Sequence, residues 1–198
     1  MGEESYQRGV QLLERARFAE ARAEFERALA ERPEWVEARI NLGVACLELG
    51  LLDEALAAFE RTRTLAPESE EVYYNLGVAY EKQQRLDEAQ AAYETAVRLR
   101  PSVPETRCNL GNVYREKGWL EPAIEQYRTA VDLQPRFALA HNNLAVTCAM
   151  TSNFESAAYH AQIAQALGYP VHADFLSHLR RELARRGGSA PRRNPPRR

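Results

Sequence analysis

The chain has 198 residues, 45% of them hydrophobic and 27% charged, with a formal net charge of −2 at pH 7. No apolar run approaches the ~18 residues that a membrane-spanning helix needs, and no secretory hydrophobic segment opens the sequence. Its three cysteines, Cys46, Cys108 and Cys148, show no C-x-x-C spacing and are typical of reduced thiols. These features favour a cytoplasmic protein.

From residue 2 to residue 171, the same residue types return every 34 positions. Each period contains two helical segments joined by a short break, such as "ELGLLDEA" or "EKGWLEPA". The spacing predicts five helix pairs, over 2–35, 36–69, 70–103, 104–137 and 138–171. The registers that define this period are Pro33, Pro67, Pro101 and Pro135; Ala21, Ala55, Ala89, Ala123 and Ala157; Gly9, Gly43, Gly77 and Gly111; and Phe25, Phe59, Tyr93 and Tyr127.

The glycines and alanines that recur inside the helices need an explanation in terms of packing. A glycine inside a helix costs about 1 kcal/mol relative to alanine. We therefore expect Gly77 and Ala89 to let two helix backbones approach closely, with Tyr80 and Tyr93 filling the volume beside them.

The chain changes character after residue 171. Phe175, Leu176, Leu179 and Leu183 recur at helical spacing, which predicts a capping helix over 172–186. Residues 187–198, "GGSAPRRNPPRR", are rich in Gly, Pro and Arg and are predicted to be a disordered basic tail. Residues 180–198 hold eight arginines and one glutamate, so the rest of the chain is acidic.

The motifs "LGVAY…AQAAY…P" and "LGNVY…AIEQY…P" resemble the tetratricopeptide repeat, whose signature is W-x2-L-G-x2-Y, A-x3-F and P. The resemblance covers residues 2–171 and implies an all-α fold, a right-handed α-solenoid of helix-turn-helix repeats. The first unit departs from the signature at Arg8 and Leu12, and the fifth at Ala145 and Ala161. Such divergence is expected of end units, which lack a neighbour on one side.

No combination of residues indicates catalysis. The sequence contains no P-loop and no G-x-G-x-x-G, and the carboxylates fall on solvated helix faces. His172 and His178 lie six residues apart, unlike a zinc-binding i, i+4 pair, and all four histidines are expected at surface or capping positions. We expect no enzyme activity, no metal site and no cofactor.

A second periodic set of residues lies on a face that the core does not need. At 100° per residue, Glu71, Asn75 and Lys82 fall within one wedge of their helix, opposite Leu76 and Tyr80. The resemblance implies that this face lines a concave groove where extended peptides lie, as in the asparagine ladder of O-linked N-acetylglucosamine transferases. An asparagine amide both donates and accepts, so it can pair with any peptide backbone. The candidate peptide-binding residues are Asn41, Asn75, Asn109, Asn112, Asn143, Glu37, Glu71, Glu105, Tyr74 and Lys82.

Several interpretations remain open. The asparagines and glutamates are also common at these places in the family, so the ladder can be a default feature. Asn112 and Asn143 match part of the carboxylate clamp of co-chaperones, but Cys108, Ala173 and Ser177 replace its cations, so this interpretation is rejected. The leading prediction is a protein-interaction scaffold or assembly factor that binds an extended, neutral to basic protein segment. The alternatives are a self-assembling scaffold that uses the basic tail, and contact of that tail with nucleic acid or an anionic membrane.

Overall fold

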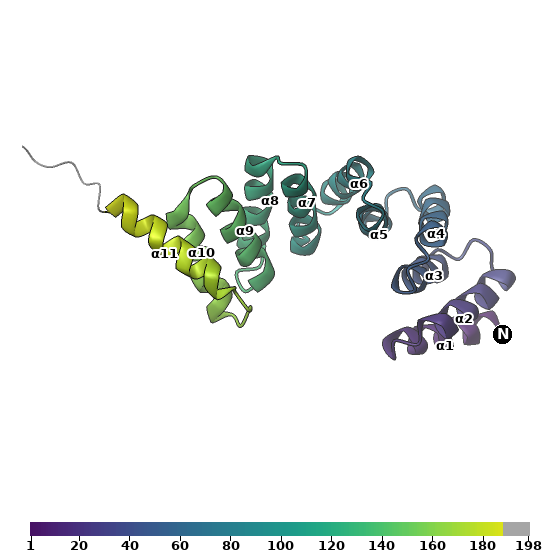
Figure 1. Ribbon diagram of the computed structural model, residues 1–198. Coiled ribbons are helices and arrows are strands. Elements are labelled where there is room, and N and C mark those ends of the chain that lie inside the picture. The colour runs from purple at the N-terminus through teal and green to yellow at the C-terminus, as the bar shows by residue number, and fades with distance from the viewer. Residues whose placement is uncertain (188–198) are drawn as a thin grey trace, which may run out of the picture. The chain divides into compact units, whose positions relative to one another are not determined.

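The computed structural model describes residues 1–187, and within them every regular element is a helix (Figure 1). This confirms the predicted all-α solenoid class. No helix of this described part is long and apolar enough to cross a membrane. The helices are α1 Gly2–Glu14, α2 Phe18–Glu31, α3 Val36–Glu48, α4 Leu52–Leu65, α5 Glu70–Lys82, α6 Leu86–Leu99, α7 Pro104–Glu116, α8 Leu120–Leu133, α9 Ala138–Met150, α10 Phe154–Ala166 and α11 Ala173–Gly187.

The chain divides into two compact units, Met1–Thr106 and Arg107–Arg198, and each is described by itself. In the first unit α1 packs on α2, α3 on α4 and α5 on α6, and the successive pairs join through α2 with α3 and α4 with α5. In the second unit α9 packs on α8 and α10. The predicted tail lies outside the described residues, except for Gly187, which ends α11 one residue beyond the predicted boundary.

A three-residue turn joins the two helices of each pair, and its middle residue has a positive φ. Gly50 and Gly118 take this left-handed conformation at φ 74° and 78° without steric cost. Ala16, Gln84 and Ser152 take it at φ 54° to 60° although they carry a Cβ. The break between the helices is therefore fixed by the chain geometry of the repeat and not by glycine alone.

The helical glycines make room for an aromatic ring from the second helix of the same pair. A Cβ built on Gly43 would lie 2.4 Å from the Phe59 ring, and one on Gly77 would lie 2.5 Å from the Tyr93 ring. Both rings are fully buried. We expected these glycines to let two backbones approach, and that reason was wrong: the atom that needs the space belongs to a side chain.

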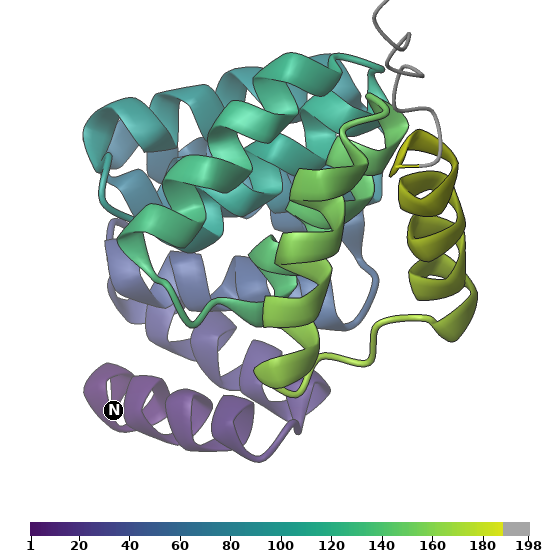
Figure 2. The same ribbon diagram turned by 90° about the vertical axis from the view of Figure 1, so that its left-hand side faces the viewer.

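The second unit shares one core between five helices, α7 to α11. Tyr127 of α8, Leu144 of α9 and Ala161 of α10 are fully buried in it. Leu179 of α11 is buried in the same cluster, and Figure 2 shows α11 lying beside α10. The apolar side of α11 thus packs on the end of this core. The helical spacing of the leucines of α11 predicts such a contact.

Candidate functional site

The predicted groove residues lie on the first helix of each pair, and the two units hold different members of the set. In the first unit, Asn75 is buried, Asn41 and Tyr74 are half-buried, and the other side chains are exposed. The second unit holds Asn109 and Asn112, which are half-buried, and Asn143, which is buried. The exposed members of the first unit are Glu37, Glu71, Lys82 and Glu105.

The ladder asparagines reach back to the first helix of the preceding pair. Asn41 of α3 donates to the Tyr6 hydroxyl of α1 at 3.4 Å, across 35 residues. Asn143 of α9 approaches the Cys108 sulfur of α7 at 3.7 Å, again across 35 residues. In these two cases the residue 35 positions earlier lies within reach of the asparagine amide.

A closed network holds the asparagines of the second unit. The Asn143 amide donates to Asn112 Oδ1 at 2.9 Å, and the same oxygen accepts from the Tyr127 hydroxyl at 2.8 Å. An amide oxygen has two lone pairs, so this oxygen is saturated. Asn112 and Asn143 therefore hold α7, α8 and α9 together. This is a structural role, one of the alternatives that the sequence left open for the ladder.

Asn75 differs from these asparagines. The residue 35 positions before it is Ile40, a buried side chain with no polar atom. The Asn75 side chain is only 9% exposed and makes no hydrogen bond within the described residues. Neither its amide nitrogen nor its amide oxygen is fully buried without a partner, so both atoms keep some contact with solvent. This amide is therefore available to a ligand, whose backbone would replace its contact with solvent by hydrogen bonds.

Acidic side chains surround this position. Partial burial of the Glu71 carboxyl raises its pKa, and the neighbouring charges of Glu70 and Glu37 raise it further, against an opposing effect of Arg100. Burial likewise raises the pKa of the Tyr6 hydroxyl, and Glu37 adds to that rise. Repulsion between these groups means that the face is short of positive charge.

Tyr74 and Lys82 contribute differently. The Tyr74 ring meets the edge of the buried Tyr93 ring, with centroids 6.0 Å apart, so this tyrosine takes part in core packing. Lys82 ends α5 with an exposed side chain. No feature of the sequence selected Tyr6 or Ile40. Their spacing of 35 residues from Asn41 and Asn75 becomes informative only when the packing of the first helices of successive pairs is known.

The second unit also contains a histidine pair. His141 Nδ1 and His160 Nδ1 lie 3.0 Å apart, and His141 Nε2 bonds the Pro135 carbonyl at 3.1 Å. His141 is buried, so the expectation of a surface or capping position was wrong for this residue. Within residues 1–187 no group of three or more His, Cys, Asp or Glu is arranged to hold a metal ion.

Three family models match this chain. Two are described as tetratricopeptide repeat and match residues 6–70 and 70–103, and a third, described as TPR repeat, matches residues 111–151. Together they cover more than half of the chain. No curated protein sequence matches it.

Solved structures of repeat proteins share the fold. MamA from Desulfovibrio magneticus RS-1 is 23% identical, with a TM-score of 0.77, and the match covers 84% of this chain and 94% of that one. YrrB, whose structure is described as a TPR protein with an unusual peptide-binding site, is 23% identical with a TM-score of 0.71, covering 89% and 90%. TTC0263, a thermophilic TPR protein from Thermus thermophilus, is 24% identical with a TM-score of 0.70, covering 93% and 100%.

Proposed function

This chain belongs to the tetratricopeptide repeat family, whose repeats build protein-interaction scaffolds, and from that premise we propose how it binds. It is a non-enzymatic scaffold that holds an extended segment of a partner protein along α1, α3 and α5, on the face of Glu37, Asn41, Glu71 and Asn75. We call this surface the first-helix face.

The open amide of Asn75 carries the proposal. A buried amide without a partner gains a donor and an acceptor bond when a peptide backbone lies across it. Asn41 already donates one amide hydrogen to Tyr6, so Asn75 has more of its amide available to a peptide. An extended backbone offers one N–H and one C=O per residue, which suits this requirement better than a folded surface does.

The charge of the first-helix face selects the partner. The pKa of Glu71 is raised mainly by burial of its carboxyl, and the charges of Glu70 and, to a smaller extent, Glu37 add to that rise. A neutral to basic segment relieves the repulsion between these carboxylates, whereas an acidic one increases it. Binding is therefore expected to weaken as salt screens the exposed carboxylates. No observation on the described residues favours self-assembly or nucleic-acid binding through the tail.

Selection of peptides from a phage-displayed random library tests this proposal. We expect the selected peptides to be enriched in Lys and Arg. Asn75→Ala should lower their affinity by about tenfold, the size of one to two buried hydrogen bonds. Gln134→Ala is the control, because it removes an exposed side-chain amide of the second unit that is not part of the first-helix face. Equal affinities of the two variants would contradict the role of Asn75.

A further inference from the structure

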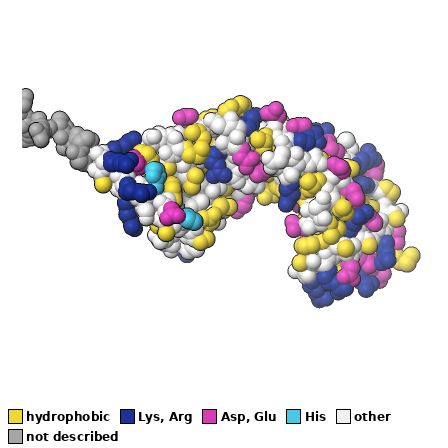
Figure 3. All heavy atoms as spheres, in the orientation of Figure 1, with side chains coloured by type: hydrophobic (Ala, Val, Ile, Leu, Met, Phe, Trp, Pro, Cys, Tyr) yellow, Lys and Arg dark blue, Asp and Glu magenta, His cyan; other side chains and the backbone are white. Residues whose placement is uncertain are grey.

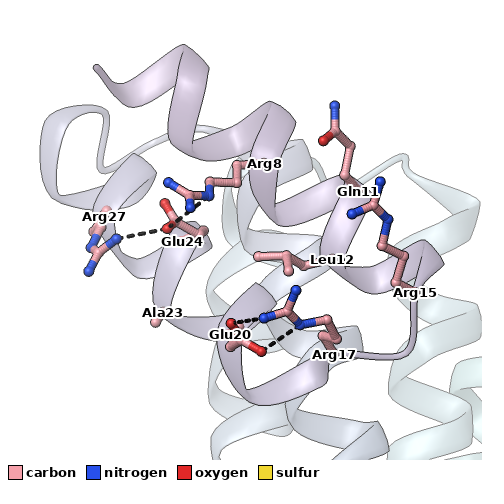
Figure 4. A pocket seen from close by; sticks show the side chains of 9 residues that line it. All are labelled: Arg8, Gln11, Leu12, Arg15, Arg17, Glu20, Ala23, Glu24 and Arg27. Atoms are coloured by element: carbon pink, nitrogen blue, oxygen red, sulfur yellow. Dashed lines mark hydrogen bonds and ion pairs between the residues drawn. The ribbon is translucent and has the colours of Figure 1, made fainter.

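A polar cavity opens between α1 and α2 at the outer side of the first helix pair. It has a volume of about 300 Å³ and is lined by Arg8, Leu12, Arg15, Arg17, Glu24 and Arg27, among others. We call it the end slot. Figure 4 shows Leu12 between two polar groups, one formed by Arg8, Glu24 and Arg27 and the other containing Arg15 and Arg17.

The end slot has more arginines than glutamates, so part of its positive charge is not neutralised. Arg17 is paired with Glu20 through both oxygens, and Arg27 bonds the buried Glu24 at 2.7 Å. Arg8 reaches the same Glu24 only at 3.9 Å. Arg15 makes no side-chain bond within the described residues. Two guanidinium groups on either side of Leu12 therefore retain donors for an anionic group.

The next two helix pairs contain a cavity at the same place in the repeat. The cavity of α3–α4 is lined by Leu42, Cys46 and Ala58, and that of α5–α6 by Leu76, Tyr80 and Ala92. These residues lie 34 and 68 positions after Arg8, Leu12 and Glu24. The inner cavities have apolar or small residues where the end slot has Arg8 and Glu24.

The preceding pair places a glutamate in the cavity of α3–α4 and another against Tyr80, a residue that lines the cavity of α5–α6. Glu26 of α2 lines the cavity of α3–α4. Glu60 of α4, 34 residues later, accepts a hydrogen bond from the Tyr80 hydroxyl at 2.7 Å. In the inner pairs, a carboxylate of a neighbouring helix thus lies at this place in the repeat.

We propose that the end slot binds an acidic helical segment of a partner protein. A glutamate or aspartate of that segment takes the place that Glu60 has beside Tyr80, and Arg8 and Arg15 donate to it. Leu12 supplies an apolar floor for the carbon atoms of the acidic side chain. The charge-assisted bonds of a guanidinium to a carboxylate are stronger than bonds between neutral groups.

A second copy of this chain is a poor occupant. The helix at the other end of the described chain is α11, and its exposed arginines are Arg180, Arg181, Arg185 and Arg186. Figure 3 shows basic side chains gathered over this helix. Because α11 would repel the arginines of the end slot, docking of a second copy through α11 is disfavoured, and the proposed occupant is an acidic helix of a different protein. The residues of the slot are not those of the first-helix face, so one proposal can fail without the other.

The probe is a stapled, fluorescein-labelled, alanine-rich helix with glutamates along one side. Fluorescence anisotropy measures its affinity for the full chain, alongside the same helix with glutamines and an unstapled acidic peptide with prolines. We expect the acidic helix to bind more tightly than both. The double variant Arg8→Leu, Arg15→Gln should weaken that binding at least about tenfold, because it removes both free guanidinium groups. Arg8→Leu supplies the residue type of the inner repeats, which favours folding, and circular dichroism checks it.

Arg136→Gln is the control, since Arg136 is an exposed arginine of the second unit. It should leave the affinity unchanged. The proposal is overturned if the acidic helix does not bind, if the flexible acidic peptide binds equally well, or if Arg136→Gln lowers the affinity as much as the double variant does. If the double variant loses its helicity, Arg15→Gln alone decides, with a loss of several fold expected and no change refuting the slot.

Discussion

Gly77→Ala is predicted to destabilise the first unit, although alanine is the better helix former. The substitution gains about 1 kcal/mol of helix propensity. The new methyl group would lie 2.5 Å from the Tyr93 ring, which is fully buried and cannot move into solvent. The Tyr93 hydroxyl also bonds Glu81 at 3.0 Å, which holds the ring in place.

The packing penalty should exceed the gain. Overpacking a filled core costs typically 1–3 kcal/mol, and such a short contact belongs at the upper end of that range. We expect a net loss of about 1–2 kcal/mol. Urea unfolding followed by circular dichroism measures it, and an unchanged m-value is required because repeat arrays can depart from two-state unfolding.

The fifth helix pair shows how the clash is avoided. Ala145 stands in the glycine register there, and Ala161 stands in the register of the aromatic ring. Gly77→Ala should therefore be tolerated when Tyr93→Leu removes most of the ring, and a double-mutant cycle gives the coupling energy. A Gly77→Ala chain as stable as the wild type, or the absence of coupling to Tyr93, would refute this packing argument.

Two other predictions concern the second unit. Burial, with the charge of His141 second, lowers the pKa of His160 to about 4, below its ordinary value of 6.5. The unfolded chain then binds the proton more readily, so stability is complete above about pH 6.5 and falls toward pH 4. The expected loss is about 2 kcal/mol, reduced from the full linkage value because His160 is only half-buried and solvent screens its charge. Urea midpoints across this range should fall less in His160→Asn, and equal slopes would contradict this prediction. Leu179→Ala should cost about 2–4 kcal/mol, because this leucine is buried in the core shared with α9 and α10. Thermal unfolding measures that cost, and exposed Leu133→Ala serves as its control.

The 34-residue period was sufficient to predict the helices, because it reports which side chains must face a core. It could not show which atoms meet inside that core. Gly77 was recognised as a position that needs space, yet the ring of Tyr93 that occupies the space was assigned to the flank. Sequence spacing gives the face of a helix and not the depth to which a neighbouring side chain reaches.

The sequence was sufficient to predict the face of the candidate site. It could not show which of the asparagine amides on that face lack a hydrogen-bond partner. Asn41, Asn75 and Asn143 look equivalent in sequence. Their difference arises from residues of the preceding pair, which become relevant only when two helices lie side by side: Tyr6 for Asn41, Ile40 for Asn75, and Asn112 with Cys108 for Asn143. The end slot was visible only as a departure of Arg8 and Leu12 from the family signature.

The 35-residue reach of the ladder has a consequence for rearranged chains. The availability of an asparagine amide is decided by a residue of the preceding block, so blocks of 34 residues are not interchangeable parts. Placing the block that contains Ile40 ahead of another asparagine-bearing block would create a second open amide, and placing a block with tyrosine at that position would close the one at Asn75. The order of the blocks would thus determine which asparagines of an array can bind a ligand, although the sequence of each block stays the same.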